Sequence, residues 1–262
     1  MSHENVSAVL VHGAWADGSS WAKVIGSLAA QVARVLAAPL PLTSFAEDTA
    51  AVERTLERVS GPAVLVGHAY AGAVIAATRN EKVKALVYVS GLAPDEGETV
   101  ADVFYRTEPH PLAPKLAPDN HGLIYLPDEA FAAAFAQNAS ADELALLSAV
   151  QRPISPACIT APVNRPLWKD RPTWFLIAEQ DRMIVRDTQR FMAERMHARV
   201  RSHPVDHTPS SPPLASSSTS YVRPLGKRSA GDRLRILGAR SGTMRQQRTT
   251  TAQVSAFSEG SL

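Results

Sequence analysis

The chain has 262 residues, of which 45% are hydrophobic and 20% charged, and its formal net charge is +2. A chain of this length and apolar content can bury one large core, so we expect one domain with insertions. The sequence does not open with positively charged residues followed by an apolar stretch, the pattern of a signal peptide. No apolar run reaches the roughly 20 residues that a membrane helix needs. We therefore expect a cytoplasmic protein with no membrane partner.

The positive charge is concentrated near the C-terminus. Residues 209–262 carry a net charge of +6, which leaves residues 1–208 at −4. A basic segment can bind nucleic acid, but this one has only Tyr221 and Phe257 as aromatic residues and no recognisable nucleic-acid motif. We therefore expect no nucleic-acid partner. The sequence leaves the oligomeric state open, a homodimer included.

Short apolar runs alternate with helical patterns along the first ninety residues. Strands are expected at 6–11, 33–37, 63–66 and 83–90, with a further one at 173–178. Helices are expected at 18–32 and 46–59 and directly after the turn at 67–72. This alternation predicts an α/β fold, a mainly parallel sheet with helices on both faces.

The pattern changes between the strand at 83–90 and the strand at 173–178. A proline-rich stretch at 109–118 is followed by a helical segment at 128–150 that is rich in Ala, Phe and Leu. An insertion that leaves the sheet at the end of a strand lies where open α/β sheets bind ligands. We therefore expect residues 92–171 to form a helical lid.

The stretch PAVLVGHAYAGAVIA at 62–76 combines an apolar strand, a small-residue turn and a helix. A turn of the form G-x-S-x-G is where α/β-hydrolases hold a nucleophilic serine on a strained backbone. Ala69 occupies the serine position here. The sequence thus predicts a nucleophile elbow without its nucleophile.

Five motifs in order resemble the α/β-hydrolase superfamily. They are VLVHGAWADGSSW at 9–21, GHAYAG at 67–72, LAPDEGE at 92–98, AEQDRMI at 178–184 and DHTP at 206–209. The most similar branch is the small single-domain one that contains plant methylesterases, hydroxynitrile lyases and bacterial relatives. The resemblance covers nearly all of residues 1–209 and implies an α/β-hydrolase fold. It also implies hydrolysis of small carboxylic esters or related acyl substrates.

The resemblance assigns a catalytic triad to Ala69 in the nucleophile position, Asp181 and His207. His207 would act as the base on a loop after the short run at 199–205, and Asp181, just past the strand at 173–178, would orient it. Asp95, which follows the strand at 83–90, is the alternative acid, because some members of the superfamily place it there.

Other candidate residues follow from the same resemblance. The oxyanion hole falls on the backbone amides of Ala14 and Tyr70, which the loss of a serine leaves in place. We expect His68 to pack or form hydrogen bonds rather than react. The single cysteine, Cys158, is expected to be a packing residue, because it has neither a disulfide partner nor a zinc-site spacing. No cofactor motif or metal cluster is present, so we expect no cofactor and no metal.

Three functional hypotheses remain open on the sequence alone. The first is an esterase-type hydrolase that Ala69 leaves nearly inactive, whether the alanine is natural or engineered. The second is a non-catalytic protein that binds a small ligand. The third is lyase-like chemistry in which His207 alone abstracts a proton from the substrate.

Residues 209–262 form a Ser/Arg-rich segment without periodicity, which by composition is expected to be disordered. The run SSPPLASSSTSYVRP at 210–224 has a second interpretation, a reading-frame slip near Pro209. If each serine has a TCN codon, the frame that starts at the third base turns every Ser-Ser step into Phe, Leu, Ile or Val. We predict that the DNA across codons 207–224 encodes this apolar pattern in the shifted frame, and codons that do not would reject the slip.

Overall fold

A computed structural model describes residues 6–32 and 34–208 of the chain. The expected domain of residues 1–208 is described except for its first five residues and residue 33. The proposed disorder and frame slip of residues 209–262 lie outside the described residues. Within the described part, no helix is long and apolar enough to cross a membrane.

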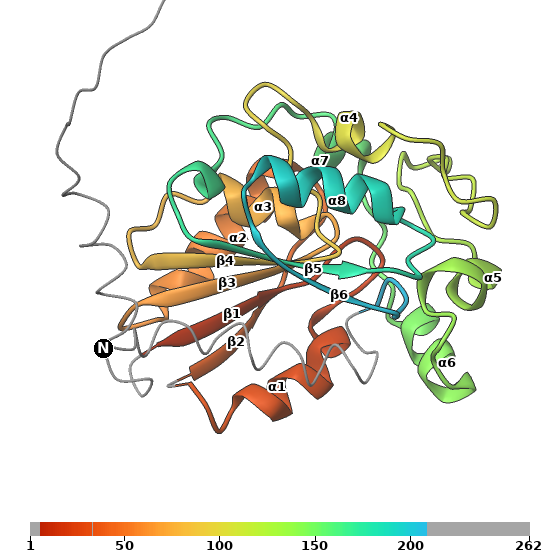
Figure 1. The fold of residues 1–262 in the computed structure, drawn as a ribbon. Coiled ribbons are helices and arrows are strands. Elements are labelled where there is room, and N and C mark those ends of the chain that lie inside the picture. The colour runs from red at the N-terminus through yellow and green to blue at the C-terminus, as the bar shows by residue number, and fades with distance from the viewer. Residues whose placement is uncertain (1–5, 33, 209–262) are drawn as a thin grey trace, which may run out of the picture. The chain divides into compact units, whose positions relative to one another are not determined.

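Six parallel strands form one sheet in the order β2-β1-β3-β4-β5-β6 (Figure 1). The strands are β1 (Ser7–Val11), β2 (Arg34–Ala38), β3 (Ala63–His68), β4 (Val83–Val89), β5 (Thr173–Ala178) and β6 (Arg199–His203). The predicted α/β sheet is confirmed, and the five strands expected from apolar runs begin and end within two residues of their predicted bounds. Every residue of β1, β3 and β5 is buried, as their continuous apolar runs indicated, whereas Arg34 of β2 and Lys84 of β4 are exposed.

Helices cover both faces of this sheet. One face carries α2 (Phe45–Glu57), α3 (Ala71–Ala77) and α8 (Arg186–Arg195), and the other carries α1 (Ala22–Leu28) (Figure 1). Alternate strand residues serve the two sides: Leu10 packs in the cluster that contains Trp21, whereas Val9 and Val11 pack in the larger one with α2 and α3. This alternation is the pleat of a strand buried between two layers.

Two elements were not predicted from the sequence. Strand β6 carries Arg199, Val200 and Arg201 with exposed side chains, so it lacks an apolar run; among the described strands it pairs only with β5, and an edge strand tolerates such charges. Helix α8 was not predicted because its buried face includes the polar Gln189, which interrupts the apolar pattern of a helix.

The segment between β4 and β5 contains short helices rather than one long one. These are α4 (Val100–Phe104), α5 (Asp128–Ala130), a π-helical turn (Phe131–Phe135), α6 (Ala141–Ala149) and α7 (Pro156–Ile159). The helical segment expected over 128–150 is present but divided, since residues 136–140 between the π-helical turn and α6 are not helical. Ser140 starts α6 with a capping box, in which its hydroxyl accepts from the Glu143 amide while the Glu143 side chain accepts from the Ser140 amide, so the chain begins a new helix there.

A close approach of α3 to the chain after β4 predicts the response of one glycine. A Cβ at Gly72 would collide with the backbone carbonyl of Leu92, whereas one at Gly26, exposed in α1, would meet nothing within 4 Å. We expect Gly72→Ala to lower the free energy of unfolding by about 1–3 kcal/mol. Gly26→Ala, the matched control, should raise it by up to about 1 kcal/mol. Urea denaturation measures both, and an unchanged midpoint for Gly72→Ala would contradict the packing.

Candidate active site

The turn between β3 and α3 holds Ala69 in a left-handed backbone conformation, with φ of 48°. A non-glycine residue rarely adopts this conformation, which costs free energy unless neighbours enforce it. Three backbone hydrogen bonds do so. The Ala69 amide donates to the Val89 carbonyl (3.2 Å), and the Ala69 carbonyl accepts from the amides of Gly72 (3.0 Å) and Leu92 (2.8 Å). The sequence GHAYAG therefore forms the sharp elbow that its pattern predicted.

Asp181 and His207 meet at the same edge of the sheet. Asp181 follows β5, His207 follows β6, and His207 Nδ1 lies 2.8 Å from Asp181 Oδ2. Both side chains are almost completely buried. With the carboxylate as acceptor, the imidazole proton lies on Nδ1, so in the neutral ring the lone pair lies on Nε2.

Three further donors hold the carboxylate of Asp181. Its Oδ1 accepts from the amides of Met183 (2.8 Å) and Ile184 (2.9 Å). Its Oδ2 accepts from Gln189 Nε2 (3.0 Å), on α8. Gln189 was not identified from the sequence, because a buried glutamine on a helix carries no motif. Together these bonds leave Asp181 one orientation, the one that faces His207.

An apolar cavity of about 60 Å³ opens at the elbow. Ala69 and His207 both line it, together with Ala14 and Tyr70. The insertion after β4 supplies more than half of the wall: Leu92, Val100, Ala101, Phe104, Tyr105, Leu116, Ile124, Ile154 and Ile159. Trp15, Met183 and Ile184 complete it. Among the described residues, no Asp, Glu, Lys or Arg side chain lines the cavity, so it suits an uncharged group.

The amides of Ala14 and Tyr70 lie in the two loops that meet at this cavity. In the described part of the chain, no backbone hydrogen bond uses either amide as a donor. A Cβ at Gly13 would lie 3.0 Å from Ala69 Cβ and 3.1 Å from the His68 carbonyl. A side chain at position 13 would therefore be tight against the elbow, and glycine allows these two loops to approach closely. The two amides, which donate to no backbone carbonyl in the described part of the chain, are candidate donors to a bound oxygen.

Two further histidines hold these loops and remain neutral. His12 Nε2 accepts from the Leu40 amide (3.1 Å), and burial lowers the pKa of His12 to about 4. His68 Nε2 donates to the carbonyl of His207 (2.7 Å), which confirms the expectation of a hydrogen-bonding role. Burial, reinforced by the neighbouring His207, lowers the pKa of His68 well below its ordinary value. His68 thus joins the elbow to the loop that carries His207.

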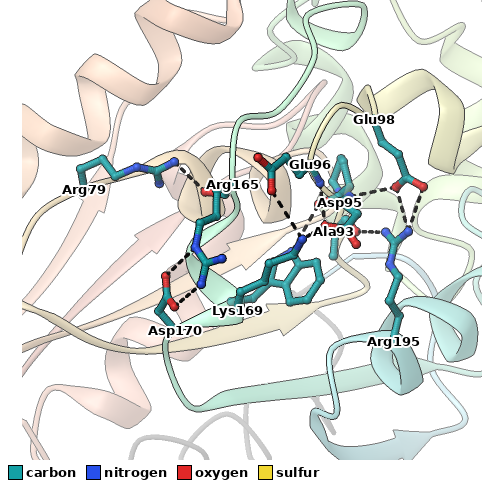
Figure 2. Close-up of polar contacts among 11 residues, drawn as sticks. Arg79, Ala93, Asp95, Glu96, Glu98, Arg165, Lys169, Asp170 and Arg195 are labelled. Carbon is teal, nitrogen blue, oxygen red and sulfur yellow. Dashed lines mark hydrogen bonds and ion pairs between the residues drawn. The ribbon is translucent and has the colours of Figure 1, made fainter.

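Asp95, the alternative acid, forms different contacts. It pairs with Lys169, whose Nζ also lies 3.8 Å from Glu96 Oε2 (Figure 2). Partial burial opposes ionisation, but the hydrogen bonds from Lys169 and the Glu96 amide outweigh it and lower the pKa of Asp95. Nearby, Arg195 of α8 donates to both oxygens of Glu98 (2.8 and 2.9 Å) (Figure 2). The LAPDEGE motif thus ties the start of the insertion to neighbouring elements.

Cys158 is completely buried on α7. Burial, together with the nearby carboxylate of Asp48, raises the pKa of its thiol to about 12. A thiol that remains protonated at neutral pH is a poor nucleophile, in agreement with the predicted packing role. Among the described residues, no group of three or more His, Cys, Asp or Glu side chains could hold a metal ion.

A parallel sheet with an elbow after a central strand, and an acid–histidine pair beside it, defines an α/β-hydrolase-type protein. The model of the alpha/beta hydrolase family matches residues 8–216, most of the chain. The chain belongs to this family. No curated protein matches it significantly.

Solved structures share this fold at low sequence identity. A pyrethroid hydrolase is 21% identical, with 84% of this chain and 98% of that one covered and a TM-score of 0.70. A mutant of polyneuridine aldehyde esterase is 17% identical, with coverage of 84% and 99% and a TM-score of 0.71. Tomato methylketone synthase I, in complex with 2-tridecanone, is 20% identical, with coverage of 83% and 97% and a TM-score of 0.67.

The neutral His12 predicts a loss of stability in acid. Its pKa is lowered to about 4 in the folded chain, so the unfolded chain binds the proton first as the pH falls below about 6.5. Between about pH 7.5 and pH 5, this one residue should remove about 2 kcal/mol from the free energy of unfolding.

Urea denaturation at the two pH values measures this loss. It should be smaller by about that amount in His12→Gln, since comparing two pH values within one variant cancels the change in its absolute stability. The exposed His121, replaced by Gln, is the matched control and should leave the loss unchanged. An equal loss in His12→Gln and the unsubstituted chain would contradict the neutral assignment.

Proposed function

We propose that the chain is an esterase-type hydrolase for small carboxylic esters in which alanine occupies the nucleophile position. With alanine at position 69, the chain would bind such esters and hydrolyse them very slowly. One observation carries this proposal: Ala69 keeps the strained elbow conformation and lines the same cavity as His207, whose Nδ1 is bonded to Asp181. An elbow and an oriented base beside an uncharged cavity suit acyl transfer.

The roles follow from the chemistry of an ester. With a serine at position 69, the hydroxyl oxygen would attack the ester carbonyl while His207 Nε2 takes its proton, and Asp181 would stabilise the resulting imidazolium. The amides of Ala14 and Tyr70 would donate to the oxyanion. The imidazolium would return its proton to the leaving alcohol. Water, activated by the same base, would then hydrolyse the acyl enzyme.

Ala69 removes the first of these steps. A methyl group has neither a proton to give nor a lone pair with which to attack. Loss of one triad member can cost as much as loss of all three, which leaves about 10³- to 10⁴-fold acceleration over water from binding and the oxyanion hole. Binding remains intact, because the cavity and both amides do not depend on the missing hydroxyl.

The cavity supports an apolar, uncharged substrate, and the names of similar structures agree with this. They include a pyrethroid hydrolase, an esterase and a protein in complex with 2-tridecanone. Because more than half of the lining residues come from the segment between β4 and β5, we propose that this insertion acts as a lid over the site.

Ala69 itself favours the second candidate, a non-catalytic protein that binds a small ligand. The intact pair of Asp181 and His207 keeps proton abstraction by His207 as the third candidate. A ligand-binding protein should be stabilised against heat by an apolar ester without consuming it. Consumption of a substrate with an acidic C–H bond by the unsubstituted chain would instead favour lyase-like chemistry.

Restoring the serine tests the proposal. Ala69→Ser should create hydrolysis of p-nitrophenyl butyrate and covalent labelling by a fluorophosphonate, because every other part of the machinery is present. His207→Ala in that background should abolish both. A folded Ala69→Ser protein with neither activity nor labelling would contradict the proposed function.

The identity of the acid is a separate prediction. In the Ala69→Ser background, Asp181→Asn should lower kcat by about 10³- to 10⁴-fold, because the asparagine favours the wrong tautomer of His207. Asp95→Asn is the matched control and should change kcat less than about threefold, since it only loses a partly exposed ion pair that does not line the cavity. Steady-state kinetics distinguishes the two, and the reverse ranking would reassign the acid to Asp95.

A further inference from the structure

A buried carboxyl group lies next to the elbow and has no part in the chemistry described so far. Asp48, in the first turn of α2, is completely inaccessible to solvent. Its Oδ1 accepts from the Leu42 amide (2.7 Å), and its Oδ2 accepts from the hydroxyl of Tyr70 (2.7 Å) and from the thiol of Cys158 (3.5 Å). All three donors are uncharged.

Burying the carboxyl group of Asp48 costs free energy that packing alone does not explain. A buried carboxyl group loses its hydration, and burial raises the pKa of Asp48 despite its hydrogen bonds. Asp48 lies four residues before Val52 and eight before Leu56, on the apolar stripe of α2, where an aliphatic side chain would fit the pattern. A carboxyl group in that position therefore indicates a specific task for one of its hydrogen bonds.

The bond to Tyr70 connects Asp48 to the site. Tyr70 follows Ala69, lines the cavity and has helical dihedral angles, φ −49° and ψ −39°. Its backbone amide is one of the two candidate oxyanion donors. Because the hydroxyl donates to Asp48, the ring is restrained, and rotation of the peptide plane before Tyr70 would strain or break a buried hydrogen bond.

We propose that Asp48 is a positioning residue that acts through the Tyr70 hydroxyl to aim the Tyr70 amide at the carbonyl oxygen of a bound ester. The assignment rests on the proposed function, since it gives that amide its target. An oxyanion donor must be held before the reaction, because a donor that has to reorient loses most of its effect. Asp48 supplies this restraint from α2, outside the elbow itself.

The competing explanation is purely structural. Leu42 has φ of 60°, and the hydrogen bond that its backbone amide donates to Asp48 Oδ1 stabilises that turn. The two roles use different oxygens, so substitutions can separate them. Tyr70→Phe removes only the Tyr70 bond to Oδ2, whereas Asp48→Leu removes all three bonds, including the one from Leu42 to Oδ1. Tyr88→Phe is the matched control, because the Tyr88 hydroxyl is buried and has no hydrogen-bond partner in the described part of the chain.

The first arm measures turnover of p-nitrophenyl butyrate in the Ala69→Ser background, per active site titrated with a fluorophosphonate. We expect Tyr70→Phe to lower kcat by about 10- to 100-fold with KM changed less than about threefold. Asp48→Leu should lower kcat to a similar extent. The kcat of the double variant should be no lower, since both substitutions remove the same hydrogen bond between Tyr70 and Asp48. Asp48→Asn should recover part of the loss. Tyr88→Phe should retain the full kcat.

The second arm needs no serine. The unsubstituted chain binds p-nitrophenyl butyrate labelled with ¹³C at the carbonyl, and difference infrared spectroscopy records the carbonyl band. The band should shift to lower frequency on binding, and Tyr70→Phe should reverse part of that shift while Tyr88→Phe does not.

The two arms keep the hypotheses apart. If Ala69→Ser is inactive but the band responds to Tyr70→Phe, the proposed hydrolysis fails and the positioning role stands. If Asp48→Leu and Tyr70→Phe lower the melting temperature but leave kcat per titrated site unchanged, and Tyr70→Phe leaves the carbonyl band unchanged, Asp48 is only structural and the proposal is overturned. An ester that fails to bind at all overturns both.

Discussion

Parallel pairing is the constraint on which the candidate site depends. Because all six described strands run in one direction, the residues that follow β3, β5 and β6 emerge at one edge of the sheet. Ala69, Asp181 and His207 are such residues, although more than a hundred positions separate the first from the second. A hydrogen bond from His68 to the His207 carbonyl then joins the loop after β6 to the elbow after β3. The sheet brings the segments together, and this bond holds them in register.

Several buried polar groups around the cavity bond to backbone or neutral partners, although His68 Nδ1 has no hydrogen-bond partner in the described part of the chain. His12 and His68 are neutral because burial disfavours their charged forms, and Asp181 receives two amides as well as an imidazole. In a medium of low polarity each unpaired group would cost several kcal/mol, so these loops have little freedom to rearrange. Such rigidity suits a site whose donors must be aimed before a substrate arrives.

The elbow persists without the residue that makes it useful. An alanine with positive φ gains nothing from its strain, yet Val89, Gly72 and Leu92 bond residue 69 from three directions, and Gly13 packs against its Cβ. The surrounding structure therefore determines the backbone at this position, whichever side chain it carries. A serine introduced there would inherit the geometry, which is why a single substitution is a fair test of the whole arrangement.

The sequence alone predicts the α/β class, five of the six described strands and the elbow, because buried parallel strands and small-residue turns have local patterns. It also assigned the pair Asp181 and His207, but only by resemblance, and kept Asp95 open. Tertiary structure decided what local patterns cannot carry. It bonded His207 to Asp181 and paired Asp95 with Lys169. It also divided the helical segment expected at 128–150 and placed β6 at the edge of the described sheet, where exposed charged residues interrupt the apolar pattern of a strand. It also turned Asp48, one acidic residue among several on α2, toward Tyr70. Each of these outcomes depends on contacts between residues far apart in the chain, and no period or motif within a single segment encodes such contacts.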